Sequence, residues 1–533
     1  MDNILKLFLK INTKHQFKDH PNQILIVDRS RTFITILQSL FGIALSQIKK
    51  KNITVLSERD KSRTISIFKS FGIKNFISSK NFYFQLIFPY VLLKSIFISI
   101  YVCLKIKFYG FDWLIEKFSI NQIKFGDLVY DSYARRDQGF LNLNLNFNFI
   151  KILFISVLKF LNISSLFKKY NFKYILVSTS VYATYSGIAA RIAINKKIKV
   201  IEPYARQGSY LSYVVYDPNG IKFYTYDNTV YGNFHKKFLT RSKKIEIKKL
   251  DDFVDKRFKG KIKTLHTGIH DLKNANKEKF YISRSELIKK FNLQEKMIKK
   301  IVIIAPHAFS DTSHNDGKLI FTDYYQAFYE TIKFVSTLKS KNILWLVKPH
   351  PSGHLYGEKG MAENVVEKYN NSYLKFCPKI NTQNLIEISD HAVTCSGRIA
   401  LEFACYGKKS ITSATNVLSR YNVYENCNSK SKYFSKLKNV ISIPRLKNSK
   451  KILAKKLLYY LDTNPPERMI KPGNILIKYK SPPKTLTSLQ TKTVLDNIID
   501  VKLVNKLKKT SFFEDAYFKD LLNIVKEDKK LSI

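Results

Sequence analysis

The chain has 533 residues, of which 45% are hydrophobic and 14% aromatic. This is enough apolar material for several cores, at roughly 100–200 residues per domain, and it excludes a largely disordered protein. The chain is strongly basic, with 91 Lys and Arg against 41 Asp and Glu and a net charge of +50. The sequence has no zinc-finger spacing, no ribonucleoprotein motif and no helix that would read a nucleic-acid groove. Nucleic acid is therefore not the expected partner.

The N-terminal twenty residues lack the long apolar stretch and small-residue cleavage site of a signal peptide. Five scattered cysteines without a CxxC pair indicate a reducing compartment rather than a disulfide scaffold or a zinc site. The lysines are spread along the whole chain, which indicates general residue bias; the other explanation is attraction to anionic ligands or to an anionic membrane surface. We expect a cytoplasmic protein, with peripheral contact at the inner face of the cytoplasmic membrane as a further hypothesis.

The first half of the chain alternates short apolar runs with helical stretches. Strands are predicted at residues 22–30, 53–58, 173–178 and 198–202, and helices at 32–49 and 182–195. Strand–helix–strand units of this kind are typical of a doubly wound parallel sheet. The sequence therefore predicts an α/β lobe over the first 240 residues.

Two apolar, basic segments interrupt this pattern. Residues 84–108 carry Lys94 and Lys105, so their longest uncharged run is shorter than the ~18–20 residues that span a bilayer, and a buried or interfacial helix is expected. Residues 147–170 are similar: they either rest on a membrane surface or pack on a sheet, and packing is favoured.

The second half restarts the alternation after a densely charged stretch at residues 241–300. Strands are predicted at residues 300–306, 342–348, 372–376, 391–395 and 409–412, and helices at 323–341, 381–389, 398–406 and 451–461. Gly407 is expected to end the helix before it. This indicates a second doubly wound lobe.

The segment from residue 344 to 353 is the most informative one. An apolar strand runs into Lys348, and two prolines flank His350. Proline fixes the backbone, and ligands of open α/β sheets bind at the carboxyl ends of strands. His350 and Lys348 are therefore candidates for binding a phosphate; the alternative is a buried histidine that caps a strand.

The segment from residue 390 to 411 is the second candidate. A strand runs into Ser396 and Gly397, and a helix follows at once. Glycine allows close backbone approach and a helix start offers N–H groups to an anion, so Ser396, Gly397 and Arg398 are expected to hold a phosphate, with Glu402 on the ribose hydroxyls. The alternative is an ordinary ion pair between Arg398 and Glu402 on one helix face.

A loop rich in His and Asp follows the strand at 300–306. It contains His307, Asp311, His314 and Asp316, before a helix that begins with aromatic residues. The spacing fits no tight zinc pattern, so a loop at the border between the lobes is expected rather than a metal site.

These segments, together with residues 123–137 and 176–193, resemble GT-B glycosyltransferases of bacterial capsule and surface-polysaccharide synthesis. The resemblance covers residues 22–415 as a pattern and is specific only in the four segments. It implies two doubly wound Rossmann-like lobes facing across a cleft, with a C-terminal helical extension. The implied divisions are an acceptor-side lobe (1–240), a charged connector (241–299), a nucleotide-sugar-binding lobe (300–450) and the extension (451–533).

The resemblance also implies a reaction. A nucleotide-sugar acts as co-substrate without other cofactors or a metal, the acceptor is a saccharide or a lipid-linked oligosaccharide, and His307 joins the donor site. Transfer with inversion needs a base for the acceptor hydroxyl and positive charge at the departing phosphate, which His350 can supply. The base is expected in the first lobe, and the candidates there are Asp127, Asp131 and Asp28, with Arg135 and Arg136 nearby; each carboxylate could equally be a cap or an ion-pair partner.

Three other functions stay open. A glycerophosphotransferase using CDP-glycerol also carries a histidine before proline, although residues 395–403 depart from its pattern. A UDP-sugar 2-epimerase shares the second motif, although the first lobe lacks its N-terminal pattern. A non-catalytic polysaccharide-binding or scaffold protein is the alternative of another class, and the phosphate-binding segments count against it.

Overall fold

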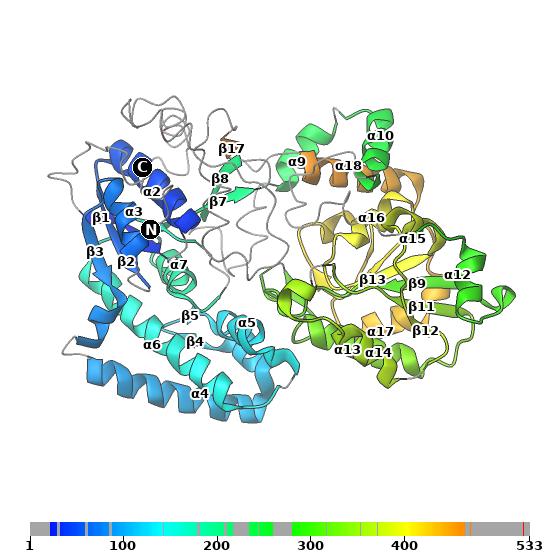
Figure 1. Cartoon of the computed structure of the whole chain (residues 1–533), viewed down its shortest axis with the longest axis horizontal. Coiled ribbons are helices and arrows are strands. Elements are labelled where there is room, and N and C mark those ends of the chain that lie inside the picture. The colour runs from blue at the N-terminus through cyan, green and yellow to red at the C-terminus, as the bar shows by residue number, and fades with distance from the viewer. Residues whose placement is uncertain are drawn as a thin grey trace.

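The computed structural model describes residues 22–28, 32–58, 62–84, 88–141, 143–178, 182–206, 210–216, 234–243, 245–259, 280–315, 317–351, 353–369, 371–463, 469–470 and 526. Within them the chain forms two α/β lobes side by side, the first on the left and the second on the right in Figure 1. The helical tail predicted beyond residue 470 lies almost wholly outside the described residues.

The sheet of the first lobe has seven strands in the order β17-β8-β7-β6-β1-β2-β3. The strands are β1 (Asn22–Asp28), β2 (Asn52–Ser57), β3 (Asn75–Ser78), β6 (Tyr174–Leu176), β7 (Lys199–Arg206), β8 (Tyr210–Tyr216) and β17 (Met469–Ile470). The five strands from β3 to β7 are parallel and follow the doubly wound order 3-2-1-4-5, while β8 and β17 are antiparallel additions at one edge. Strand β17 returns to this sheet after the chain has built the second lobe.

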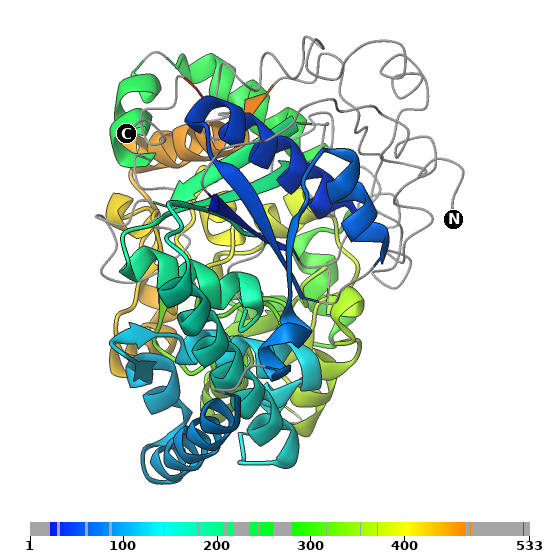
Figure 2. The ribbon, with the colours of Figure 1, turned by 90° about the vertical axis from the view of Figure 1, so that its left-hand side faces the viewer.

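Helices cover both faces of this sheet (Figure 2). They are α2 (Thr32–Lys49), α3 (Ser62–Ser70), α4 (Phe88–Lys117), α5 (Gly126–Asp137), α6 (Phe147–Lys169) and α7 (Tyr185–Asn195), with short helices η1 (Ser79–Phe84) and η2 (Gly139–Leu141) and the small hairpin β4 (Ser119–Ile120) and β5 (Ile123–Lys124). Successive residues of a strand face opposite sides, so Ile26 meets Gly42 of α2, whereas Leu25 and Val27 join the core formed by α4–α7.

Helices α4 and α6 pack against each other at the edge of this lobe. Within the described residues, α6 alone is long and apolar enough to cross a membrane, but 61% of its apolar window is buried inside the protein, as in a core helix. Packing was the favoured prediction for this segment. Helix α4 was also predicted, and it continues past the expected end because Gly110, at φ 74°, joins two helical halves.

The sheet of the second lobe is wholly parallel and has the order β12-β11-β9-β13-β14-β16. The strands are β9 (Lys300–Ile304), β11 (Ile343–Val347), β12 (Leu374–Phe376), β13 (His391–Thr394), β14 (Ile411–Thr412) and β16 (Glu425–Asn426), with a separate pair β10 (Lys318–Leu319) and β15 (Ala414–Thr415). Numbered along the chain this is 3-2-1-4-5-6, the order of a Rossmann sheet. The predicted fold class, two doubly wound Rossmann-like lobes of the GT-B type, is confirmed.

Helices also cover both faces of the second sheet. They are α9 (Phe234–Ser242), α10 (Ile247–Phe258), α12 (Arg284–Lys290), α13 (Tyr324–Thr337), α14 (Met361–Lys368), α15 (Thr382–Ile388), α16 (Ile399–Cys405), α17 (Lys430–Lys438) and α18 (Asn448–Thr463), with η3 (Glu295–Met297), η4 (Gly353–Tyr356), η5 (Ser419–Tyr421) and η6 (Val440–Ser442). Val302 and Ile304 face one core and Ile301 and Ile303 the other, which is why these strands read as unbroken apolar runs.

Segments assigned to the connector and the extension pack on the second lobe. Helices α9 and α10 contact α18, and α18 contacts α16. The predicted boundary at residue 240 falls inside α9, and the one at residue 450 falls inside α18. Gly407 ends α16 at φ 75°, as predicted.

Candidate functional site

Three strands of the second sheet end level with one another. The register aligns Ile304 of β9 with Val347 of β11 on one side and with Val393 of β13 on the other. His307, His350 and Ser396 each lie three residues beyond this level. Strands β9 and β13 flank the point where the strand order reverses, which is where open α/β sheets bind ligands.

The three side chains lie close together. The Nε2 atom of His307 is 3.4 Å from Oγ of Ser396. Its ring stacks on Tyr324 at 4.4 Å between centroids, and the His350 ring lies parallel to it at 6.0 Å. Burial lowers the pKa of His307 to about 4, so at neutral pH this imidazole is uncharged and acts through hydrogen bonds and stacking.

Lys348 lies at the same edge. Its Nζ atom donates to Oγ1 of Thr382, the first residue of α15, at 3.3 Å. Burial lowers the pKa of Lys348, while nearby Glu402 opposes this. An ammonium group has three N–H donors, so one bond to Thr382 leaves the lysine able to bind a phosphate oxygen.

Gly397 makes the turn after β13 close. A Cβ atom there would lie 2.7 Å from Oγ1 of Thr394, so a larger residue would push against the end of the strand. The helix that follows begins at Ile399, one residue later than predicted, and is seven residues long. Arg398 precedes it with αR backbone angles.

Arg398 and Glu402 are held by different partners. Nη1 of Arg398 binds Asp462 of α18 at 2.6 Å, and Oε1 of Glu402 binds Arg257 of α10 at 2.9 Å. Arg257 also binds Asp462, at 2.6 Å. These ion pairs join α10, α16 and α18. Arg398 and Glu402, which were expected to bind the donor, therefore also stabilise the packing of these helices.

Polar contacts join the two lobes next to this edge. Oδ1 of Asp131, on α5, is 2.7 Å from Nδ1 of His314 in the loop after β9. The Nε2 atom of His314 is 2.9 Å from the carbonyl oxygen of Thr322 and must donate to it, because a carbonyl only accepts. The loop therefore borders the first lobe, as predicted.

The acid–base state of this pair follows from burial. Burial alone would lower the pKa of His314, but Asp131 overrides it and the pKa is raised. Burial also raises the pKa of Asp131, against the effect of His314. Next to them the Tyr130 hydroxyl donates to Asp323, the N-terminal cap of α13. Burial raises the pKa of Asp323 to about 6.

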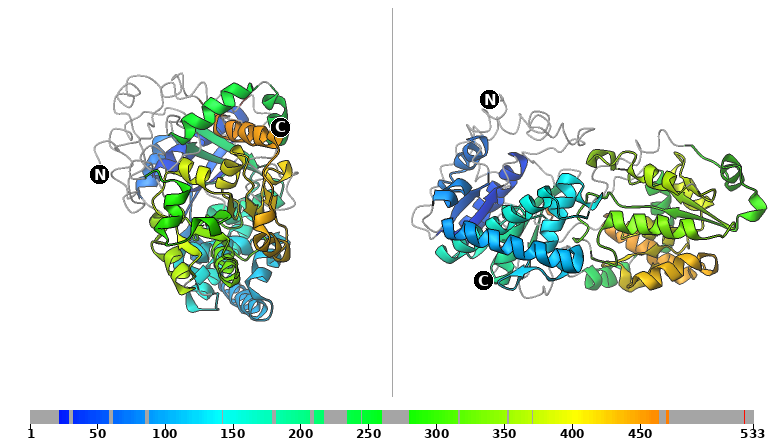
Figure 3. Two further views of the ribbon diagram at one scale, coloured as in Figure 1. Left: turned by 90° about the vertical axis from the view of Figure 1, so that its right-hand side faces the viewer. Right: turned by 90° about the horizontal axis from the view of Figure 1, so that it is seen from below.

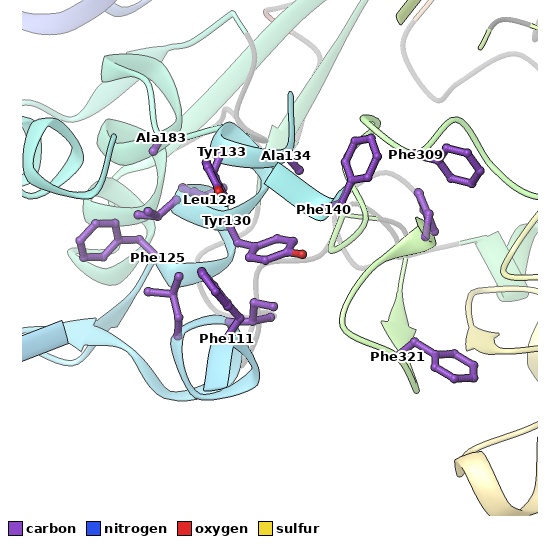
Figure 4. Close-up of a cluster of buried hydrophobic side chains, with 14 of the residues drawn as sticks. Phe111, Phe125, Leu128, Tyr130, Tyr133, Ala134, Phe140, Ala183, Phe309 and Phe321 are labelled. Carbon is purple, nitrogen blue, oxygen red and sulfur yellow. The ribbon is translucent and has the colours of Figure 1, made fainter. Parts of the chain in front are cut away.

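The apolar part of the same interface centres on Phe140 of η2. Its ring lies 5.9 Å from Phe309 and 5.2 Å from Tyr325, both in the second lobe. Figure 4 shows Phe140 on the cyan ribbon of the first lobe reaching Phe309 on the green ribbon of the second. Gly139, the residue before Phe140, lies against Tyr133 of α5, because a Cβ atom there would lie 2.2 Å from the ring of Tyr133.

The other two carboxylates predicted in the first lobe have their printed partners within that lobe. Asp127 forms a buried ion pair with Arg191 of α7, at 2.6 Å. Asp28 is buried at the end of β1 and accepts a hydrogen bond from Thr35 at 2.8 Å. Of the three candidate bases, Asp131 is the one that contacts the second lobe.

The two predicted arginines of α5 differ. The guanidinium of Arg135 lies 4.0 Å from the ring centroid of Tyr356, in η4 of the second lobe, and its Nη1 is buried without a hydrogen-bond partner in the described residues. Burial raises the pKa of Tyr356 to about 12. Arg136 is exposed. Arg135 therefore faces the second lobe close to the segment that carries His350.

Several residues of the site were missed by the sequence analysis. Tyr324, which stacks on His307, was predicted only as one of the aromatic residues that begin a helix. Tyr356, Arg257 and Asp462 carried no motif at all. The sequence offered one signal for Tyr324: aromatic residues directly after the helix cap Asp323 are placed at the start of α13.

No protein-family model matches the chain, and no curated protein matches it in sequence. Among solved structures, Thermosulfurimonas dismutans KpsC, a beta Kdo 2,4 transferase, is similar with 13% identity over 54% of this chain and 79% of its own, at a TM-score of 0.31. A co-structure of S. aureus MnaA with UDP has 13% identity, 84% and 99% coverage and a TM-score of 0.26. A UDP-GlcNAc 2-epimerase from Neisseria meningitidis bound to UDP-GlcNAc has 12% identity, 82% and 99% coverage and a TM-score of 0.22. These scores lie below 0.5, so the fold assignment rests on the strand orders.

Proposed function

We propose that this protein is a nucleotide-sugar-dependent glycosyltransferase that acts on a growing surface polysaccharide or a lipid-linked oligosaccharide. One observation carries the proposal. His307, His350 and Ser396 stand at the same offset beyond three neighbouring parallel strands, at the point where the strand order reverses. A nucleotide diphosphate is the ligand chemistry that suits this edge.

The donor would lie with its phosphates toward His350 and Lys348. Lys348 supplies positive charge, and His350 supplies a ring nitrogen held between two prolines. His307 is neutral and sandwiched by Tyr324 and His350, so its part is to position His350 and to hydrogen-bond. These groups stabilise the charge that develops on the departing phosphate, and the scheme uses no metal.

The acceptor would enter from the first lobe. In the transfer step the bond from the sugar C1 to the phosphate oxygen breaks, and a bond from C1 to the acceptor oxygen forms. The acceptor hydroxyl loses its proton to a base, and the electron pair of the broken bond goes to the phosphate. We propose Asp131 as the base, because it lies at the contact between the lobes and burial raises its pKa toward the working range.

Arg135 is the second group proposed on the acceptor side. Its Nη1 has no partner among the described residues although it is buried, so a hydroxyl or an anionic group of a substrate would satisfy it. Its guanidinium lies against Tyr356, three residues after Gly353 at the end of the segment that carries His350. Arg135 thus stands between the proposed donor and acceptor positions.

Binding of nucleotides tests the donor site. Isothermal titration of CMP, CDP, UDP and GDP is expected to identify one tight ligand. His350→Ala and Lys348→Ala are each expected to weaken it about tenfold or more, the loss of one charge-assisted hydrogen bond. His235→Ala, a histidine packed on Tyr421 outside the site, serves as the matched control and keeps full affinity.

The reaction itself is tested with the matching nucleotide-sugars and an oligosaccharide acceptor. Release of nucleotide together with a lengthened acceptor, unchanged by EDTA, is the expected result. If the assay instead yields an isomerised nucleotide-sugar and no lengthened acceptor, the protein is an epimerase and not a transferase. If the wild-type protein binds no nucleotide, the proposal is overturned, and the alternative of a non-catalytic polysaccharide-binding or scaffold protein takes its place.

A further inference from the structure

Helix α4 carries an apolar surface that no described element covers. Half of the large hydrophobic side chains that are exposed in the described residues lie on its first part, before Gly110. Phe97 is 69% exposed and Phe108 is 75% exposed. Seen from below the molecule, α4 lies in front of the rest of the first lobe (Figure 3, right).

The exposed side chains form one continuous stripe. It consists of Tyr90, Leu93, Phe97, Ile100, Tyr101, Leu104 and Phe108. The intervals of three and four residues place these side chains on one face of a helix. An apolar stripe of this kind normally faces a core.

The opposite face of α4 packs into the lobe. Its buried residues before Gly110 are Val91, Ser95, Ser99, Val102 and Ile106. The hydroxyls of Ser95 and Ser99 bond to carbonyls four residues earlier, at 2.8 and 2.7 Å, so they need no other partner. A water-facing surface helix exposes polar side chains, whereas α4 is apolar on its outer face as well as on its buried face. This indicates an apolar environment on its outer side.

The charges on this surface have one sign. Between residues 88 and 109 there are three lysines, Lys94, Lys105 and Lys107, and no acidic residue. The ammonium of Lys94 lies 5.7 Å from the ring of Tyr90, and that of Lys105 lies 5.7 Å from Tyr101 and 5.2 Å from Tyr109. Lysine beside tyrosine is the residue pair of the bilayer headgroup region.

We propose that the outer face of α4 rests on the surface of an anionic membrane. The uncharged run at residues 95–104 is too short to span a bilayer, so the helix lies in the plane of the interface, over a length of about 33 Å. Its aromatic and aliphatic side chains enter the acyl boundary, and its lysines bind lipid phosphates. A second copy of the chain fits less well, because its lysines would oppose these lysines without a carboxylate between them.

Flotation with lipid vesicles tests this proposal on the full-length chain. Wild-type protein is expected to float with vesicles of mixed phosphatidylcholine and phosphatidylglycerol and to bind phosphatidylcholine vesicles weakly. An apolar variant replaces three stripe residues: Leu93→Ser, Phe97→Ser and Leu104→Ser. Its binding is expected to fall on the order of 100-fold, and its thermal unfolding to stay unchanged, because these side chains are exposed.

Two further variants separate the contributions. A charge variant with Lys94→Gln, Lys105→Gln and Lys107→Gln is expected to lose on the order of 100-fold in binding to anionic vesicles and nothing with phosphatidylcholine. A control variant replaces exposed hydrophobic residues elsewhere, with Leu239→Ser, Ile247→Ser and Tyr281→Ser, and is expected to bind like wild type. Failure of the wild type to float, or full binding by the apolar variant, would overturn the proposal. If the wild-type protein is a dimer and the apolar variant is a monomer, the outer face of α4 binds a second copy of the chain instead.

Discussion

Replacing Asp323 with Asn tests whether a buried carboxyl between the lobes holds its proton. The Asp323 side chain is fully buried, caps α13 through the backbone N–H of Gln326 at 2.6 Å, and accepts the Tyr130 hydroxyl. Burial raises the pKa of this carboxyl from 3.8 to about 6, although both hydrogen bonds oppose the shift. Asn keeps an oxygen that accepts a hydrogen bond and cannot ionise.

The sign and the size of the effect follow from proton binding. As the pH rises from the unfolded pKa toward the folded pKa, the folded protein keeps a proton that the unfolded chain has lost, so the free energy of unfolding falls. A shift of about two units corresponds to roughly 3 kcal/mol, and the loss is complete above the folded pKa. The Asn variant lacks this loss, so its stability relative to wild type is expected to increase by roughly 3 kcal/mol between about pH 4 and pH 7.

Urea unfolding of both proteins at a series of pH values measures this difference. The comparison cancels the contributions of the titrating groups that do not interact with Asp323. Tyr130→Phe is the companion variant: it removes a hydrogen bond that lowers the Asp323 pKa, so the fall of its stability is expected to extend to higher pH than in wild type. Parallel curves for wild type and the Asn variant would refute the reasoning.

Three other substitutions test the interface, a helix end and the donor turn. Phe140→Ala removes a fully buried ring between the lobes and is expected to cost about 3–5 kcal/mol in urea unfolding; a cost below about 1 kcal/mol would mean that the lobes close over the gap. The Lys408 ammonium donates to three carbonyl oxygens at the end of α15, at 2.5–2.7 Å, so Lys408→Met is expected to lower the unfolding free energy by about 1–3 kcal/mol, whereas the exposed Lys359→Met is expected to leave it unchanged. Gly397→Ala is expected to weaken nucleotide binding by pressing on Thr394, and adding Thr394→Ala is expected to restore it; titration of the double variant decides whether the contact is the cause.

Much of the second lobe could be predicted because its strands are buried on both faces. Runs such as residues 300–304 and 343–347 are almost unbroken apolar sequences. Because parallel strands all point the same way, the residues that follow these runs meet at one edge of the sheet. The helix of residues 323–341 was predicted too long. Its last predicted turn is absent: α13 ends at Thr337, and Leu338 has extended backbone at ψ 117° although it continues the apolar spacing.

Contacts between distant segments could not be predicted from local patterns. Asp131 and His314 are 183 residues apart, and nothing near either of them marks the other. Asp127 and Asp131 look alike on α5, four residues apart, yet one meets Arg191 inside the first lobe and the other meets the second lobe. Strand β17 consists of Met469 and Ile470, and two apolar residues in the sequence do not reveal that the chain returns to the first sheet there.

Helix α4 reaches the second lobe both directly and through α5. Asp112 of α4 accepts a hydrogen bond from Thr322 of the second lobe, at 2.8 Å. Phe111, just after Gly110 in α4, packs on Tyr130 and Tyr133 at 5.7 and 6.4 Å, and Tyr130 itself bonds to Asp323 across the interface. A direct hydrogen bond and one layer of aromatic rings therefore join the outer helix to the segment that begins α13. The helix with the exposed apolar face is thus mechanically connected to the contact between the two lobes.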